Sequence, residues 1–157
     1  FGLHSHVEHT VVGVRRPASW YSSLWRYQQS LDWPTWPERD DFPTSALIRL
    51  PHPDYTTWIR NCIDRHPGYL SRMLAAYWDS IPRNCLPEKH VITQENLRRD
   101  FVCLLMDLGY NHIVVPPPSH VSPPSEPGTL YDTSLPSSTL DRLLQVESGV
   151  SQFYRCW

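Results

Sequence analysis

Three histidines near the start of the chain are the residues best suited to bind a metal ion. His4, His6 and His9 lie close together, and Glu8 precedes the last of them. Alternate residues of an extended segment lie on the same side, so His4 and His6 can face one ion. A complete site needs more ligands, and no second group of ligands is recognisable elsewhere in the sequence. We therefore predict no metal or other cofactor, with a metal-binding module at these histidines as an alternative.

Cys62 and His66 form a second chemical candidate, because residues four apart share one face of a helix. A neighbouring histidine can activate a thiol as a nucleophile, so a Cys–His enzyme is another alternative. Cys62 lies in an apolar stripe, however, and apolar surroundings raise the pKa of a thiol and make it unreactive. The sequence has no glycine-rich phosphate loop, no HExxH motif and no GxSxG motif. We therefore predict no catalytic residue.

Asp40 and Asp41 are paired carboxylates at the start of a short segment that we interpret as a docking element. Nearby arginines can neutralise them, which favours an ion-paired turn over a catalytic pair. Pro43 suits the first position of a helix and Pro51 cannot continue one, so the helix between them has two turns at most. Such a short helix is marginal alone in water and needs neighbours to pack on. The residues predicted to bind a partner here are Asp40, Asp41, Arg49, Leu50 and Pro51.

The composition favours a protein that binds other proteins. The chain has 157 residues, a net charge of -2 and only 19% charged residues, but seven Trp, eight Tyr and four Phe. That length suffices for one domain with a core. The near-neutral charge argues against general nucleic-acid binding, which requires a basic face. Many aromatic and few charged residues are typical of buried interfaces. No apolar run approaches the roughly 20 residues of a membrane span.

Helical periodicity predicts a mostly α fold, a small set of short helices with extended Pro-rich N- and C-terminal segments. We expect an extended lead over 1–18, a helical domain over 19–109, and a Pro-rich tail with a short terminal helix over 110–157. Within the lead, 10–14 can lie extended or add to the edge of a sheet. Asp54 is a predicted N-cap. The expected helices cover about 19–31, 55–65, 70–81, 93–108 and 139–148.

The clearest helical stripe lies within 93–108 and ends at Gly109, a natural C-terminal stop. The stripe consists of Leu97, Phe101, Leu104, Leu105 and Leu108.

Tryptophan is concentrated in the first half of the chain, where six of the seven lie between residues 20 and 78. A core of this size accommodates about two or three of them. The others are better interpreted as anchors in another protein, because aromatic side chains dominate binding energy at interfaces. The aromatic anchors that we predict are Trp20, Trp25, Tyr55, Trp58 and Trp78.

The order of these features resembles the 14 kDa subunit family (subunit 7, the ubiquinone-binding protein) of mitochondrial ubiquinol–cytochrome c reductase, respiratory complex III. That family begins with an aromatic helix, as 20–27 does, followed by a basic residue and an acidic pair, here 39–41. An Ala-Leu-x-Arg-Leu-Pro element follows at 46–51, and a second Leu-Pro at 86–87 precedes a last helix. The resemblance covers about 19–108. The acidic pair stands closer to the element than is usual, and the terminal segments have no counterpart.

The resemblance implies a helical peripheral subunit on the matrix side of the mitochondrial inner membrane, without a redox centre. Its expected partners are cytochrome b and the matrix-side core proteins, and contact with phospholipid is left open. We therefore predict a non-catalytic accessory subunit of complex III, with no nucleic-acid partner and no transmembrane segment of its own. The alternative within this class is an accessory subunit of complex I, ATP synthase or the mitochondrial ribosome.

Overall fold

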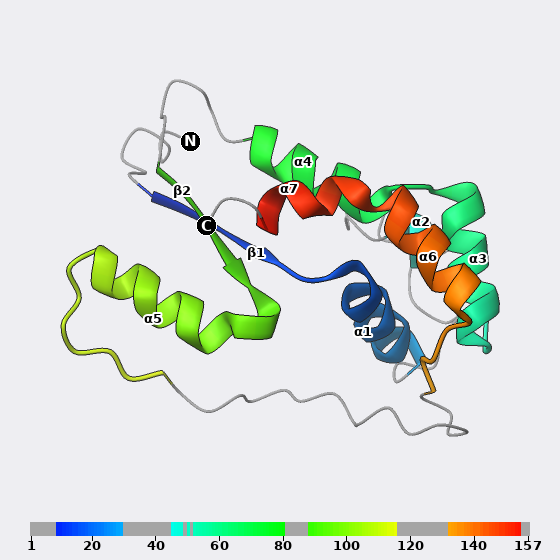
Figure 1. Ribbon diagram of the computed structural model, residues 1–157, viewed down its shortest axis with the longest axis horizontal. Helices are drawn as coiled ribbons and strands as arrows, with labels where there is room; N and C mark the ends of the chain where they lie inside the picture. Colours follow the sequence, from blue (N-terminus) through cyan, green and yellow to red (C-terminus); the bar gives the residue numbers. More distant parts are fainter. Residues whose placement is uncertain are drawn as a thin grey trace.

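A computed structural model describes residues 9–29, 45–48, 50, 52–80, 88–115 and 132–154 of the chain. These residues are mostly helical and include a two-stranded parallel sheet, which confirms the predicted fold class (Figure 1). Most of the Pro-rich stretch that was predicted to be extended lies outside the described residues. None of the helices within these ranges combines the length and the apolar character needed to cross a bilayer.

The helices follow the predicted periodicity, with small shifts at their ends. α1 begins at Pro17, two residues before the predicted start, because proline is well suited to the first helical position. The helix predicted from Thr93 begins at Leu97, since Thr93 is the last residue of a strand. In chain order the elements are β1 (His9–Val14), α1 (Pro17–Gln29), α2 (Ser45–Ile48), α3 (Tyr55–Arg65), α4 (Tyr69–Asp79), β2 (Glu88–Thr93), η2 (Gln94–Asn96), α5 (Leu97–Asp107), α6 (Ser137–Val146), η3 (Ser148–Val150) and α7 (Ser151–Tyr154).

Asp54 caps α3, as the sequence predicts. Its backbone is extended, and its Oδ2 accepts a hydrogen bond of 2.7 Å from the N–H of Thr57. Hydrogen bonds from the hydroxyl and the N–H of Thr57 lower the pKa of the Asp54 carboxyl. The cap therefore favours the ionised side chain.

Replacing this cap is expected to have a small effect that depends on pH. Asp54→Ala should lower the free energy of unfolding by about 1 kcal/mol at pH 7, as measured by urea unfolding. Because the folded pKa is depressed, the ionised cap contributes fully above the unfolded pKa of about 3.9. That contribution is lost as the pH falls through the folded pKa. Asp54→Ser should retain most of the stability, and equal losses in both variants would contradict the capping role.

The sheet joins the beginning of the chain to its middle. β1 and β2 are parallel, and the register pairs His9 with Glu88 and Val14 with Thr93. Alternate side chains face the interior, where Val14 and Val91 are buried. The sequence allowed an extended 10–14 segment, but the partner strand was not predicted.

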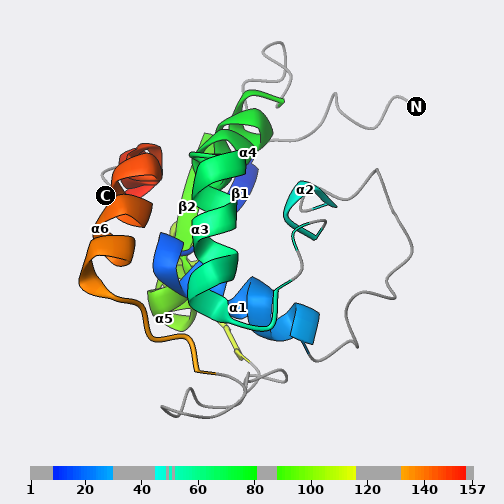
Figure 2. The ribbon, with the colours of Figure 1, turned by 90° about the vertical axis from the view of Figure 1, so that its right-hand side faces the viewer.

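The core lies between the first four helices and the C-terminal segment. α6 packs on α3 and α1, and η3 packs on α4 (Figure 2). Leu143, Val150 and Phe153 belong to the same buried cluster as Trp58 and Ile59 of α3. The core therefore crosses the predicted domain boundary at 109–110. The physical reason is that the short amphipathic helices α3 and α4 have apolar faces that α6 and η3 cover.

Candidate functional site

Three of the predicted aromatic anchors lie in the interior of the chain, and this corrects the sequence-based interpretation. Trp25, Tyr55 and Trp58 expose 2%, 3% and 0% of their surface. The rings of Trp25 and Tyr55 have centroids 5.3 Å apart, and those of Tyr55 and Trp58 are 6.1 Å apart. Leu50, another predicted partner residue, is also buried. The two fully buried tryptophans fall within the two or three that a core of this size accommodates, but both were predicted to be anchors.

The other predicted partner residues are half-buried or lie outside the described residues. Trp20 and Trp78 both pack against the core of the chain itself. The ring of Trp78 contacts that of Phe153 edge to face, with centroids 5.6 Å apart, and Lys89 Nζ lies 4.6 Å from its centroid. The docking segment is described only in part, as α2 and Leu50. The remaining candidates, Asp40, Asp41, Arg49 and Pro51, are not among the described residues.

Glu147, which the sequence analysis did not single out, is a buried carboxylate that accepts four hydrogen bonds. The hydroxyl of Tyr21 donates to its Oε1 at 2.6 Å, and the N–H of Leu70 donates to the same atom at 3.1 Å. Its Oε2 accepts from the N–H and the hydroxyl of Ser71, at 2.8 and 2.7 Å. Four bonds match the acceptor capacity of an ionised carboxylate. Glu147 therefore ties together α1, α4 and the end of α6.

Glu147 also performs the N-capping of α4, which the chain's own N-cap residue cannot do. That residue is Gly68, with a φ of 67° and no side chain to accept the first free N–H groups. A Cβ on Gly68 would lie 3.0 Å from the carbonyl oxygen of Val146, so a larger residue would push α6 away. Burial, and then the charge of Glu147, raise the pKa of the Tyr21 hydroxyl, which therefore remains a donor. The arrangement fastens α1, α4 and the end of α6 to one another.

The Cys–His alternative receives no geometric support. Cys62 is buried in α3, and burial raises the pKa of its thiol. His66 is the C-cap of the same helix, and its backbone N–H donates to the carbonyl oxygen of Cys62 at 2.8 Å. The His66 ring lies edge-on to Tyr69, with centroids 6.1 Å apart. No hydrogen bond joins the thiol to the imidazole in the described structure.

The apolar residues of α5 cover a wider arc of the helix surface than the face that is buried. Leu104 is buried, yet it lies outside the main core cluster, and α5 packs on β2. Phe101 and Met106 are exposed, and Val102 and Leu105 are half-buried. These four are neighbours on the helix surface, because 102 and 105 are three residues apart and the pairs 101/105 and 102/106 are four apart. An apolar arc that extends beyond the buried face is the surface that a partner would cover.

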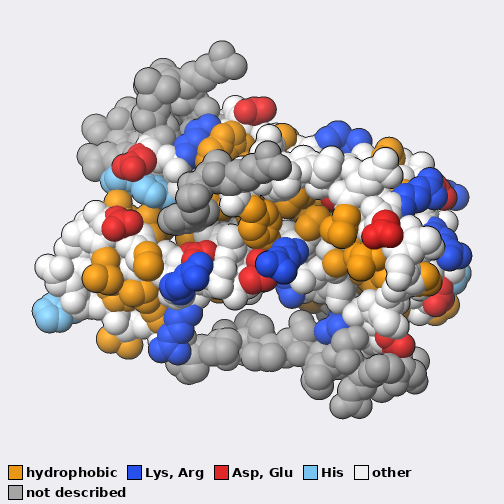
Figure 3. All heavy atoms as spheres, in the orientation of Figure 1, with side chains coloured by type: hydrophobic (Ala, Val, Ile, Leu, Met, Phe, Trp, Pro, Cys, Tyr) orange, Lys and Arg blue, Asp and Glu red, His pale blue; other side chains and the backbone are white. Residues whose placement is uncertain are grey.

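Exposed apolar residues concentrate in this part of the chain. Nine large hydrophobic residues of the described structure are exposed, and five of them lie in 97–114. Figure 3 shows hydrophobic side chains gathered on the side of the molecule where Figure 1 places α5. The stripe predicted for this helix is thus only partly used by the chain itself. The five exposed residues are Leu97, Phe101, Met106, Tyr110 and Val114.

Of the three candidate metal ligands, only His9 is a described residue. It is the first residue of β1 and lies beside Glu88 and His90 of β2. Neither partner was predicted from the sequence, although the alternation of Glu88 and His90 indicates a shared face once 88–93 is assigned as a strand. His4 and His6 lie outside the described residues.

The chain was compared with protein-family models, with curated proteins and with solved structures, and nothing matched.

Proposed function

We propose that this protein is a non-catalytic accessory subunit that docks on a larger protein assembly through α5. The observation that carries this proposal is the apolar face of α5 that the described part of the chain leaves uncovered. Phe101 and Met106 expose 37% and 63% of their surface on a helix that is otherwise regular and well formed. Covering the exposed part of each such side chain would contribute on the order of 1 kcal/mol.

The charges on α5 indicate what kind of surface would fit it. Arg99 pairs with Asp100, with Arg99 Nη2 and Asp100 Oδ1 3.0 Å apart, and thus serves the chain's own fold. Arg98 is exposed and precedes Phe101 and Val102 by three and four residues, so it shares their face. The occupant that fits is therefore a protein surface with apolar side chains and a carboxylate opposite Arg98.

The resemblance described above makes complex III the assembly that we propose, at the matrix face of the mitochondrial inner membrane. The partners would be cytochrome b and the core proteins, and electron transfer would belong to those chains. The burial of Trp25 and Trp58 moves the proposed contact from the first half of the chain to α5. Complex I, ATP synthase and the mitochondrial ribosome are the competing assemblies, and site-specific cross-linking separates them from complex III.

A photoreactive phenylalanine analogue at position 101 tests the proposed contact. The full chain would be expressed in the cells that make it, irradiated, and its cross-links identified by mass spectrometry. We expect cross-links from position 101 to a complex III subunit. The matched control carries the analogue at Tyr77, an aromatic residue of α4 that is 46% exposed, and should give no such product.

Serine substitutions at Phe101 and Tyr77 measure how much each side chain contributes to association with the assembly. Phe101→Ser should weaken the association of the chain with the assembly about fivefold, while Tyr77→Ser should leave it unchanged. Cross-links to complex I, ATP synthase or the ribosome would move the assignment away from complex III. Cross-links only to a second copy of this chain, or equal products from both positions, would overturn the accessory-subunit proposal.

A further inference from the structure

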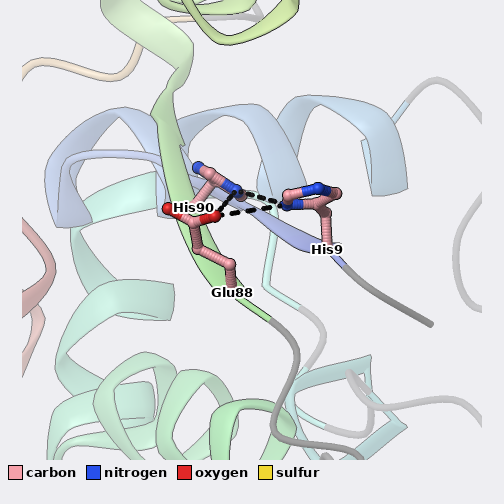
Figure 4. A group of neighbouring side chains, drawn as sticks. All are labelled: His9, Glu88 and His90. Atoms are coloured by element: carbon pink, nitrogen blue, oxygen red, sulfur yellow. Dashed lines mark hydrogen bonds and ion pairs between the residues drawn. The ribbon is translucent and has the colours of Figure 1, made fainter. Parts of the chain in front are cut away.

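The outer face of the sheet brings two imidazoles and a carboxylate to one point. His9 Nδ1 lies 3.2 Å from His90 Nε2 and 3.5 Å from an oxygen of Glu88. The same Glu88 oxygen lies 4.0 Å from His90 Nε2. Figure 4 shows the three side chains converging from the two strands. Each residue thus presents one potential ligand atom to the same small volume.

The pairing of the strands is what creates this arrangement. The parallel register places His9 directly opposite Glu88. Glu88 and His90 are alternate residues of β2, so their side chains leave the same face of the sheet. The interior-facing alternates, such as Val91, are buried on the other side. The cluster is therefore a consequence of the register, and a shift by one residue would separate its members.

The three distances match the ligand shell of a transition-metal ion. Zinc binds imidazole nitrogen and carboxylate oxygen at about 2.0–2.2 Å, so tetrahedral ligand atoms stand roughly 3.3–3.5 Å apart. The separations of 3.2, 3.5 and 4.0 Å lie around that value. The point equidistant from the three atoms is about 2.1 Å from each, which is a zinc–ligand bond length. Small side-chain rotations would bring the set to tetrahedral geometry.

We propose that His9, Glu88 and His90 bind one divalent late first-row transition-metal ion, and that zinc is the ion the site fits best. Two imidazoles and one carboxylate form a known zinc donor set, which leaves a fourth position for water or a further ligand. The ligand atoms are His9 Nδ1 and His90 Nε2, so the protons of the neutral rings lie on His9 Nε2 and His90 Nδ1. A hydrogen bond between the two rings is the competing account of their 3.2 Å approach.

The consequence of binding would be structural. The ion would join residues 81 apart in the chain and fasten the two strands to each other. A two-stranded sheet is marginal by itself, and only the three-residue η2 separates β2 from α5. A ligand that binds the folded state and not the unfolded state stabilises the fold by mass action. The site would thus hold in place the strand from which the docking helix extends.

The experiment is a titration of the full chain, stripped of metal, with zinc chloride by calorimetry and by thermal unfolding. We expect one zinc ion per chain and a rise in Tm of roughly 5–10 °C at a hundredfold excess of zinc over Kd. His90→Ala and Glu88→Gln should each weaken binding at least tenfold, the loss found even for outer-shell partners of metal ligands. Nitrogen-15 NMR of the histidine rings should show His9 Nδ1 and His90 Nε2 as the bound atoms.

Two controls keep the assignment specific. His112→Ala removes an exposed histidine outside the cluster and should leave zinc binding unchanged. A His4→Ala, His6→Ala double variant should also bind zinc, because neither residue belongs to the proposed site. The proposal is overturned if the full chain binds no zinc, or if His90→Ala binds as tightly as the original chain. Loss of binding only in the His4, His6 variant would overturn it too, and would place the site in the N-terminal segment.

Discussion

Glu147→Gln is expected to lower the free energy of unfolding by about 3 kcal/mol or more, and the Tm by roughly 6–12 °C. Glu147 is 1% exposed, and two hydroxyls and two backbone N–H groups donate to its carboxylate. Hydrogen bonds to charged groups contribute more to stability than bonds between neutral groups. The NH2 group of the glutamine would face hydrogen-bond donors, and it cannot accept a hydrogen bond from them. The favourable interaction of the charge with the N-terminus of α4 would also be lost.

The matched control for this substitution is Asp141→Asn, the same chemical change at an exposed position of α6. It should alter stability by less than about 0.5 kcal/mol in the same urea titration. Tyr21→Phe removes one of the four donors and should cost about 1–2 kcal/mol. If Glu147 acts through these bonds, a double-mutant cycle of Tyr21→Phe and Glu147→Gln will give a coupling energy well above zero. A cost for Glu147→Gln no larger than that of Asp141→Asn would contradict the capping role.

Trp58→Ala is expected to destabilise the isolated chain by about 3–5 kcal/mol, because it leaves a large cavity in the middle of the core. Trp58 is completely buried, and its ring centroid lies 6.0 Å from that of Tyr21 and 6.1 Å from that of Tyr55. Since small domains are stable by only about 5–15 kcal/mol, this loss would remove a large share of the free energy of unfolding. Circular dichroism with urea titration would measure it.

Trp58→Phe separates the stability lost through the cavity from the stability lost through removal of the indole N–H. The Nε1 of Trp58 is buried without a hydrogen-bond partner in the described structure, so losing it removes no bond. Phe should therefore cost less than about 2 kcal/mol. Tyr77→Ala, at an exposed position of α4, should cost less than about 0.5 kcal/mol. If Trp58→Ala left the isolated chain as stable as before but weakened its assembly, the anchor interpretation would be restored.

Local features of the chain were predictable because neighbours in sequence decide them. The helical stripe of α3, the Asp54 cap and the break before Gly68 all depend on residues within one or two turns. The mostly α class follows from the same periodicity. Helix boundaries differed by a few residues from the predicted ones where strand pairing competed with a local helix signal. At Thr93 the predicted helix start is instead the last residue of β2, which pairs with Val14.

The sequence by itself determined which segments form helices and where they stop, because hydrogen bonds within one turn and the spacing of apolar residues are local. Only the tertiary structure decided which aromatic rings lie inside, which strand pairs with β1, and that Glu147 caps a helix 77 residues away. These outcomes depend on contacts between segments that are distant in the sequence. The free energy of such contacts cannot be inferred from a local sequence pattern. The His9, Glu88 and His90 cluster is another such outcome, because the register of the two parallel strands brings these residues together.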